Sequence, residues 1–589
     1  MSNHQKFIGV YLQNKQLFVE ALSGIILSGD VIVPLYIEGG VIRINKVIDE
    51  CQIETLITEN RYKNTLVNNF PSIKNIVVLD DNSGVIQKHD EKRVISIECD
   101  KRVVGCNVRT VKDSIQNYIY AIYTSGSTGS PKGIKVTNYN VMHLFDWLKI
   151  NFNLTSSTRS YHHLSTSFDF GLKEMFNILM NGGSLVLSTT HDIYQPNKMV
   201  EQINKHKVNL LYTTPTIFRE IIDGHGKMPT IDLICLGGEV LDYSLLYELK
   251  YQLKDDVIIY NGYGPSETSI NALMHKVELT EFKKNSDFSS VPIGVSSGNS
   301  SVLLLDQNLN LLPAGIIGEI YIGGPGVTEG YINDELLTRK KFKKINIGNK
   351  QSTYYKTGDL AVYNERNEIV FINRVDDEVK IRGFRVNLTE IESTLRQLPY
   401  IEYSKVLYDE KLIAYIKPTK NINIHIKNSI YEFLKKQLPN YMIPNELIEL
   451  QKVPVTKNGK LDKLKLIELV SESKVGHESM NITNNDLDKR ILMCWERVLG
   501  KNIVNSIDDN FFDIGGHSLN AYKLLNLLEE EFKLKFNITE IFEYSTIKSF
   551  RKKMEEMKTE EIKNEDVLIQ NLVERNRRIE SIRKRRDRL

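Results

Sequence analysis

An alternation of short apolar runs with amphipathic stretches, repeated over about the first 365 residues, restricts the fold of this chain more than any other feature. Short apolar runs are typical of buried strands, and the stretches between them have helical periodicity. Strands that alternate with helices favour an α/β architecture with largely parallel sheets. We therefore assign residues 1–372 to a large α/β core. Its clearest strand-like runs are Asn75–Leu79, Tyr118–Tyr123, Ser184–Leu187, Leu210–Thr213 and Leu233–Leu236.

The pattern changes in five later segments. Residues 296–372, at the end of the core, hold short strand-like runs and many glycines, which indicates a smaller β-rich subdomain. Residues 373–470 have the pattern of a small α+β C-terminal subdomain. The polar stretch 471–485 is typical of a linker, and residues 486–557 have the periodicity of a small helical bundle. Residues 558–589 form a charged tail, either helical or disordered.

Composition places the chain among globular proteins of the reducing cytosol. A length of 589 residues exceeds one compact core, so several domains are expected. The net charge of +2 indicates no nucleic-acid partner. Five scattered cysteines without a C-x-x-C pair argue against a zinc site or a disulfide framework. The N-terminus lacks a signal-peptide pattern, and no apolar run reaches the roughly 20 residues that span a bilayer, so we expect a cytoplasmic location.

A candidate phosphate-binding loop follows one of the predicted strands. Residues 123–133 read YTSGSTGSPKG, and such small residues leave backbone N–H groups free to surround an anion. The loop is not a Walker loop, because Pro131 stands where that motif requires glycine. A flexible surface loop is the alternative interpretation. The candidate anion-binding residues are Thr124, Ser125, Gly126, Ser127, Thr128, Gly129 and Lys132.

Three further segments carry candidate site residues. Residues 261–268 read NGYGPSET, and a carboxylate after such a turn suits Mg²⁺ on a triphosphate, although Glu267 at a helix start is the alternative. Residues 355–360 read YKTGDL, where Asp359 can accept hydrogen bonds from two ribose hydroxyls. Residues 371–392 read FINRVDDEVKIRGFRVNLTEIE, a charged stretch of a kind that usually forms a solvated face.

Near the C-terminus a serine stands beside two glycines. Residues 509–519 read DNFFDIGGHSL, which places the hydroxyl of Ser518 at an expected helix start that another enzyme can approach. A helix N-cap is the alternative. A hydrolase nucleophile is disfavoured, because the second glycine of G-x-S-x-G is missing.

These motifs, taken in order over residues 7–557, resemble an adenylation module of a nonribosomal peptide synthetase followed by a peptidyl carrier domain. SGSTGSPKG matches the signature loop of the adenylate-forming superfamily, and DNFFDIGGHSL matches the carrier attachment site. QLPNYMIP, with Met442 and Pro444, and NGKLDK, with Lys460, match the final adenylation segments. The resemblance implies the α/β core, β-rich subdomain, small α+β subdomain and helical carrier domain that the periodicity also predicts.

The resemblance implies amino-acid adenylation by ATP, giving aminoacyl-AMP and pyrophosphate, and then thioester loading onto phosphopantetheine at Ser518. The implied cofactors are ATP, Mg²⁺ on Glu267 and 4'-phosphopantetheine, and Asp376 is the implied hinge. The implied catalytic residues are Lys460, Thr128, Lys132 and Glu267. Beyond the signature loop, the implied ATP-binding residues are Gly238, Asn261, Gly262, Tyr263, Gly264, Ser266, Asp359, Arg374 and Lys380.

Residues 167–176, SFDFGLKEMF, resemble the substrate segment of amino-acid-activating members. Asp169 then pairs with the substrate α-ammonium, which favours an α-amino acid over an aryl or fatty acid. The remaining implied lining is Phe170, Lys173, Tyr212, Ile234, Leu236, Gly262, Ile270, Asn271 and Lys460. Lys173 either pairs with an acidic or polar substrate side chain or extends outward to water, since an unpaired buried lysine is costly.

Three departures from the family pattern stand out. The segment Phe7–Tyr11 matches a point well inside the family's first domain, so we expect a missing first strand and helix, and a sheet edge that is exposed or borrows a partner. Glu329 replaces a usual arginine and Asn373 a usual glycine, and neither change removes a reacting group, so we expect retained activity. The alternatives are a catalytically weakened carrier or scaffold protein and a free acyl-CoA synthetase, which the carrier motif disfavours.

The resemblance also implies partners: a phosphopantetheinyl transferase and other synthetase subunits, of the condensation or thioesterase kind, acting in trans. The tail is a candidate docking element, because residues 575–589 carry eight basic and two acidic side chains, a net of 8 − 2 = +6. Leu572, Ile579 and Ile582 give this segment a narrow apolar stripe, which suits docking onto an acidic helix or an anionic surface. A disordered charged tail is the alternative.

Overall fold

The computed structural model divides the chain into two compact units, Met1–Tyr408 with Thr419–Ile443 and Asp409–Pro418 with Pro444–Leu589. No described helix is long and apolar enough to cross a membrane. The described residues are 5–80, 86–89, 92–96, 115–126, 131–189, 195–223, 227–249, 253–254, 256–277, 290–381, 383–409, 411–419, 424–454, 461–463, 465–467, 485–499, 504, 506–511, 514, 518–534, 536 and 538–556.

The first unit begins with an eight-stranded sheet in the order β5-β6-β4-β3-β1-β2-β7-β8, parallel from β6 to β7. Its strands are β1 (Phe7–Tyr11), β2 (Val31–Pro34), β3 (Thr55–Thr58), β4 (Asn75–Val78), β5 (Ile86–His89), β6 (Lys92–Ser96), β7 (Tyr118–Thr124) and β8 (Lys132–Thr137). The helices among them are α1 (Lys15–Ser28), α2 (Val41–Glu50) and α3 (Lys63–Asn69), with a 3-10 turn η1 (Asn60–Tyr62). Strand β1 pairs with β2 on one side and β3 on the other, and the edge strands of this sheet, among the described residues, are β5 and β8.

A second sheet of seven strands has the order β10-β9-β11-β12-β13-β14-β15 and is parallel up to β13. Its strands are β9 (Arg159–His162), β10 (Ser184–Leu187), β11 (Leu210–Thr213), β12 (Leu233–Gly237), β13 (Ile258–Tyr263), β14 (Leu273–Val277) and β15 (Val295–Ser296). The helices of this part are α4 (Asn138–Asn151), α5 (Asp169–Met180), α6 (Pro196–Lys205), α7 (Pro215–Asp223) and α8 (Tyr243–Leu249), with η3 (Ser266–Thr268). The predicted α/β core is thereby confirmed.

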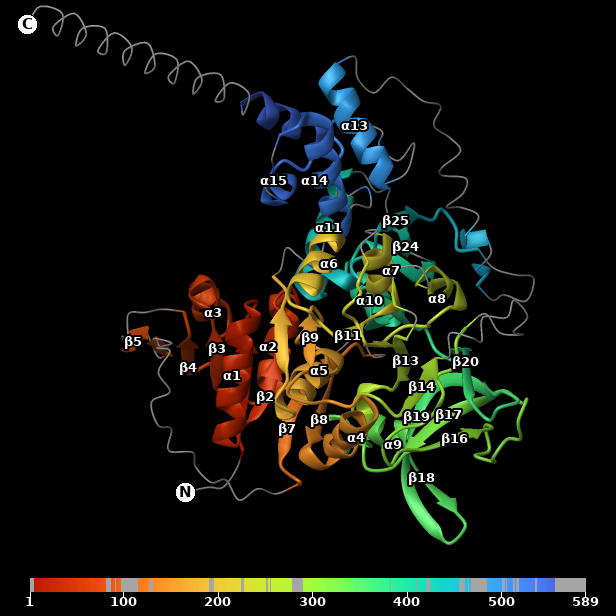
Figure 1. The fold of residues 1–589 in the computed structure, drawn as a ribbon. Helices are drawn as coiled ribbons and strands as arrows, with labels where there is room; N and C mark the ends of the chain where they lie inside the picture. The colour runs from red at the N-terminus through yellow and green to blue at the C-terminus, as the bar shows by residue number, and fades with distance from the viewer. Residues whose placement is uncertain are drawn as a thin grey trace, which may run out of the picture. The chain divides into compact units, whose positions relative to one another are not determined.

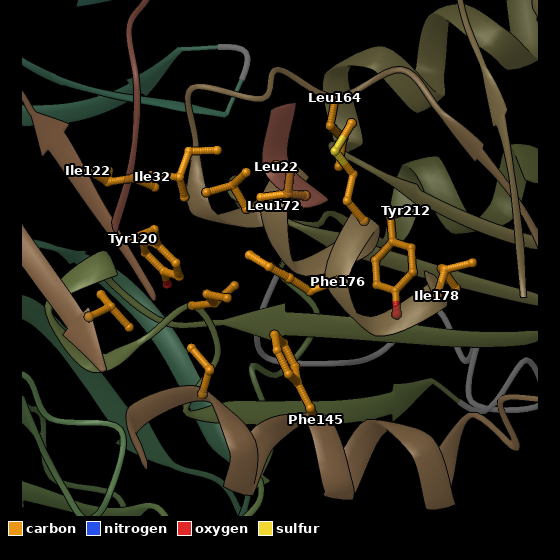
Figure 2. Close-up of a cluster of buried hydrophobic side chains, with 14 of the residues drawn as sticks. Leu22, Ile32, Tyr120, Ile122, Phe145, Leu164, Leu172, Phe176, Ile178 and Tyr212 are labelled. Carbon is orange, nitrogen blue, oxygen red and sulfur yellow. The ribbon is translucent and has the colours of Figure 1, made fainter. Parts of the chain in front are cut away.

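Helix α5 is buried along most of its length and joins the two sheets through one apolar cluster. Figure 2 shows Phe176 of α5 between Tyr120 of β7, Phe145 of α4 and Tyr212 of β11. The rings of Phe145 and Phe176 lie 6.2 Å apart. Because α5 is enclosed, every polar side chain on it must find a partner inside the protein or a ligand.

The predicted β-rich subdomain is present and is drawn in green in Figure 1. It is an antiparallel sheet in the order β16-β17-β19-β18, with β20 also paired to β19. Its elements are β16 (Ser301–Leu305), β17 (Gly318–Gly323), α9 (Glu335–Lys341), β18 (Phe342–Ile347), β19 (Lys350–Tyr363) and β20 (Ile369–Arg374). A two-stranded hairpin follows, and it too belongs to the first unit. This last part of the unit comprises β21 (Glu378–Ile381), β22 (Phe384–Asn387), α10 (Leu388–Leu395), β23 (Ile401–Asp409), α11 (Ile424–Gln437) and η5 (Asn440–Met442).

The second unit holds two parallel strands, β24 (Lys411–Pro418) and β25 (Glu446–Glu449), and the predicted helical bundle. The bundle helices include α13 (Asp486–Leu499), α14 (Ser518–Phe532) and α15 (Ile538–Glu543), and residues 547–556 are also helical. Trp495 is 2% exposed, and its ring centroid lies 5.0 Å from that of Phe511. Nη1 of Arg551 lies 2.7 Å from Oδ2 of the buried Asp488. The bundle therefore has its own core. The charged tail lies outside the described residues.

Candidate active site

The predicted metal-binding carboxylate, Glu267, is fully buried in the short turn η3. The hydroxyl of Tyr331 donates to its Oε1 at 2.6 Å, and Nη1 of Arg385 lies 3.1 and 2.9 Å from its two oxygens. Burial opposes ionisation, but Arg385 and Tyr331 more than offset this and lower the pKa of Glu267. Glu267 is therefore a charged carboxylate that already binds a cationic group.

This environment fits a divalent cation, because Mg²⁺ binds through one or two carboxylates and phosphate oxygens. Glu267 would hold the metal. In the structure, however, Arg385 of β22 contacts both carboxylate oxygens. A metal ion at Glu267 would therefore compete with the guanidinium for the same two oxygens.

Replacing Arg385 by glutamine is expected to tighten Mn²⁺ binding at Glu267, in the presence of ATP, by at least about threefold, because removing a competing arrangement raises the binding-competent fraction. Titration followed by electron paramagnetic resonance measures this directly. Arg339→Gln is the matched control, since that arginine pairs only with exposed Glu335 in the described contacts. Unchanged Mn²⁺ affinity in Arg385→Gln contradicts the competition.

A second buried carboxylate, Glu378 of β21, links the hairpin to the signature loop. Its Oε2 lies 2.6 Å from both Arg374 and Arg385, and its Oε1 lies 3.6 Å from Nζ of Lys132. Burial raises the pKa of Glu378, but the opposing effect of the surrounding arginines and Lys132 is larger. The pKa of Glu378 therefore lies well below its ordinary value. The solvated-face interpretation of residues 371–392 is therefore wrong at this position.

Glu378 and Arg385 were missed by sequence reasoning as individual site residues. Only the density of charge in VDDEVKIRGFR signalled them. The same hairpin region also holds the described part of the signature loop: Ser125 donates to the carbonyl of Arg385 at 2.6 Å, and the N–H of Gly126 donates to Glu390 at 2.9 Å. Thr124 is buried beside them.

The predicted ribose-binding residues do come together. Asp359 on β19 and Arg374 on β20 are cross-strand partners, and Nη1 of Arg374 donates to Asp359 at 2.5 Å. The hydroxyl of Tyr263 donates to the other oxygen of Asp359 at 2.5 Å. Nζ of Lys380 lies 5.6 Å over the Tyr263 ring, and burial lowers the pKa of Lys380. Nε and Nη2 of Arg374 also donate to the two carboxylate oxygens of the predicted hinge residue Asp376, at 2.8 and 3.1 Å.

Two glycines allow the hairpin to approach the end of β12. Gly238 has φ +85°, and a Cβ there would lie 3.4 Å from Cα of Gly383, which itself has φ +80°. The N–H of Gly383 donates to Glu239 at 2.7 Å. Left-handed φ at both positions favours glycine.

The predicted turn residues after β13 are held by backbone geometry. A Cβ on Gly264 would lie 2.4 Å from the carbonyl oxygen of Ile270, so no side chain fits there. Asn261 donates through Nδ2 to the carbonyl of Pro292 at 2.9 Å, which fixes the strand and gives Asn261 a structural contact. A Cβ on Gly262 would lie 2.8 Å from the amide of Asn271, which brings these two predicted lining positions side by side.

Asp169 is the first residue of α5 and lies beside the same turn. Burial raises the pKa of Asp169, and the nearby Ser266 side chain opposes that shift. One helical turn later, Lys173 is 0% exposed, and its Nζ donates to Asn271 at 2.7 Å. The interpretation in which Lys173 extends outward to water is therefore wrong.

On β12 the structure corrects the predicted lining. Cys235 shares a cluster with Tyr212 and lies 3.9 Å from Nζ of Lys173. Its neighbours Ile234 and Leu236 belong to the cluster on the opposite side of the sheet. Successive side chains of a strand point to opposite faces of the sheet. An assignment of lining residues that is shifted by one position along the strand therefore selects the wrong face. Cys235 and Gly237, and not Ile234 and Leu236, therefore lie on the face of β12 that meets α5, and a Cβ on Gly237 would lie 3.4 Å from the Phe170 ring.

Several predicted residues cannot be placed by the structure. Ser127, Thr128, Gly129 and Lys460 lie outside the described residues, as does the side chain of Ser518. The helix α14 does begin at Ser518, as the motif predicts.

Two family models match the chain. The model described as AMP-binding enzyme matches residues 2–332, and the model described as phosphopantetheine attachment site matches residues 489–552. Bacitracin synthase 2 of Bacillus licheniformis is 33% identical over 476 residues, which make up 78% of this chain and 17% of that protein. Gramicidin S synthase 2 of Brevibacillus brevis is 30% identical over 459 residues, 76% of this chain and 10% of that protein. The chain thus spans only a small fraction of the length of these curated relatives.

Solved structures share the fold. One, described as an NRPS protein containing adenylation and PCP domains, has a TM-score of 0.71 at 20% identity and covers 93% of this chain and 87% of its own. The adenylation domain AlmE of Vibrio cholerae, in complex with glycyl-adenosine-5'-phosphate, has a TM-score of 0.68 at 20% identity and covers 79% of this chain and 89% of its own. Both likenesses concern the arrangement of the elements.

Proposed function

Since the chain belongs to the AMP-binding enzyme family and carries a phosphopantetheine attachment domain, we propose that it adenylates an amino acid with ATP and loads it as a thioester onto its own carrier domain. The proposed substrate is an α-amino acid. The proposed partners are a phosphopantetheinyl transferase and further synthetase subunits, of the condensation or thioesterase kind, acting in trans.

One observation carries this proposal: the turn η3 joins the candidate amine site to the candidate metal site. The Ser266 side chain acts on the Asp169 carboxylate, where it opposes the rise in pKa that burial causes, while the next residue, Glu267, contacts Tyr331 and Arg385. Nζ of Lys132 lies 5.8 Å over the Tyr331 ring. An amino acid held at Asp169 would therefore lie close to groups that neutralise phosphate charge.

In the proposed first step a carboxylate oxygen of the amino acid attacks the α-phosphorus of ATP. The new oxygen–phosphorus bond gives aminoacyl-AMP, and the bond to pyrophosphate breaks. Such transfer depends on positioning and charge neutralisation more than on covalent help from the protein. Asp169 holds the ammonium, Asp359 the ribose, and Lys132 and Lys460 neutralise developing negative charge. Glu267 would hold a Mg²⁺ ion, which would supply positive charge beside the phosphate oxygens.

In the proposed second step the aminoacyl group passes from AMP to a thiol. Phosphopantetheine, when attached at the α14 start on Ser518, supplies that thiol. In the structure Arg385 of the hairpin contacts Glu267. We propose that rotation near Asp376 exchanges this arrangement for one in which Lys460 reaches the nucleotide.

Amino-acid-dependent exchange of labelled pyrophosphate into ATP tests the proposal. Exchange with at least one of the twenty protein amino acids, dependent on Mg²⁺, is the expected result. Absence of exchange with every amino acid, in protein that binds ATP, favours the alternative of a carrier or scaffold protein without turnover.

Lys460→Ala is expected to reduce pyrophosphate exchange by about 100- to 1000-fold, as loss of a group that stabilises the transition state usually does. Transfer from a preformed aminoacyl-AMP to the carrier thiol should change only a few fold, because that step follows loss of pyrophosphate. Lys463→Ala, which changes an exposed lysine nearby in the sequence, is the control. Equal losses in both half-reactions would contradict this role for Lys460.

A further inference from the structure

Lys173 is a fully buried lysine without an acidic partner. Among the residues the structure describes, no carboxylate oxygen lies within 4.0 Å of its Nζ. The ammonium donates to the amide oxygen of Asn271 at 2.7 Å and lies 3.9 Å from the sulfur of Cys235. Burial raises the pKa of the Cys235 thiol, so both contacted groups are neutral.

Two aromatic rings complete the surroundings of Lys173. Its Nζ lies 4.4 Å from the Phe170 ring centroid and 4.8 Å from that of Tyr212. Cation–π contacts favour a charged ammonium but do not neutralise it. A buried charge without a counterion is strongly unfavourable. Burial accordingly lowers the pKa of Lys173, and a bound anion would act in the opposite direction.

The nearby carboxylates are committed elsewhere. Glu174, the next residue, accepts hydrogen bonds from Ser160 and, at 2.6 Å, from His162 on β9. Asp169 lies one turn before Lys173 on α5; burial raises its pKa, and the Ser266 side chain opposes that shift. Residues four apart lie on one face of a helix, separated by about 6 Å along its axis. Asp169 and Lys173 therefore place one negative and one positive group on the same face of α5, one turn apart.

We propose that Lys173 selects an α-amino acid whose side chain carries an anionic group, of the carboxylate class found in aspartate and glutamate. This inference rests on the proposed adenylation function. The substrate ammonium pairs with Asp169, and its side-chain carboxylate pairs with Lys173, so that each buried charge of α5 meets its opposite. Phe170 alone among the described contacts of Nζ is partly exposed, so the substrate side chain approaches the ammonium past this ring.

The first test compares acids with their own amides in pyrophosphate exchange by the full chain. L-Aspartate and L-glutamate are measured against L-asparagine and L-glutamine, which match them in size and differ in charge. The expected result is a kcat/KM for one of the acids at least about 100-fold above that of its amide, because loss of a buried charge pair is costly.

The second test removes or satisfies the lysine charge. Lys173→Met keeps the length of the side chain without its charge and should lower the ratio of kcat/KM for the preferred acid to kcat/KM for its amide by about 100-fold. Asn271→Asp replaces the amide that Lys173 now contacts by a carboxylate of the same size, so that Lys173 gains a partner within the protein. This variant should abolish the preference for the acid without leaving a cavity. Lys15→Met is the matched control: this lysine donates to Ser188 and the His162 carbonyl, away from Nζ of Lys173, and the acid-to-amide ratio should stay as in the wild type.

The outcomes separate this inference from the function on which it rests. Wild-type exchange that is strongest with a neutral amino acid overturns the inference and leaves adenylation intact. An acid-to-amide ratio that Lys173→Met and Asn271→Asp leave unchanged, in folded protein, also overturns it. Exchange with no amino acid at all contradicts the proposed adenylation function itself.

Discussion

Ser518→Ala is expected to abolish covalent loading of the chain while pyrophosphate exchange stays within about twofold of the wild type. The reason is that the proposed adenylation chemistry does not use Ser518: Asp169, Glu267 and Asp359 belong to the first compact unit, whereas Ser518 begins α14 in the second. Without the hydroxyl, no phosphodiester to phosphopantetheine forms and no thiol accepts the aminoacyl group. Intact mass spectrometry after treatment with a phosphopantetheinyl transferase, and again after addition of amino acid and ATP, measures both steps.

Ser545→Ala is the matched control for this experiment. Ser545 lies in the same helical domain, and its hydroxyl accepts from Asn510 at 2.7 Å. This variant should gain the mass of the arm and then of the amino acid. A mass gain in Ser518→Ala would place the arm on another residue and remove the basis for loading at α14.

Glu267→Gln should lower the rate of pyrophosphate exchange by about 100- to 1000-fold, equivalent to roughly 3–4 kcal/mol of transition-state stabilisation. Glutamine keeps the size of the side chain but loses the charge that the structure surrounds with Arg385 and Tyr331. A neutral amide is a poor ligand for Mg²⁺ beside a triphosphate, so the Mg²⁺ concentration needed for half-maximal exchange should also rise.

Glu329→Gln is the control for this prediction, because it makes the same chemical change on an exposed side chain that accepts from Tyr118 at 2.6 Å. Thermal unfolding should accompany both assays, since Glu267→Gln leaves part of the buried Arg385 charge uncompensated. If Glu267→Gln keeps near-normal exchange and an unchanged Mg²⁺ requirement, this carboxylate does not hold the metal.

Two sequence-based interpretations changed for reasons that no local pattern contains. The charged segment 371–392 has the composition of a surface, yet Glu378 and Glu390 are almost fully buried, because basic groups and N–H donors from distant segments meet them. On β12, the apolar run LICLG is compatible with either alternation of faces, and only its packing against α5 shows that Cys235 lies on the Lys173 side. A fully buried parallel strand carries no polar–apolar alternation from which its faces can be read.

The sequence by itself determined the class of fold, the order of its parts and the identities of Asp169, Glu267, Asp359 and Ser518 as candidate residues. The class of fold follows from periodicity, which depends on neighbours along the chain, and the candidate residues follow from motifs that resemble those of the adenylate-forming family and of carrier domains. The tertiary structure alone decided that Arg385, 118 positions beyond Glu267, binds its carboxylate, and that Lys173 turns inward to Asn271 instead of outward to water. Buried charges choose their partners by proximity in space after the sheets and α5 have packed, because only then does desolvation make an unpaired charge costly.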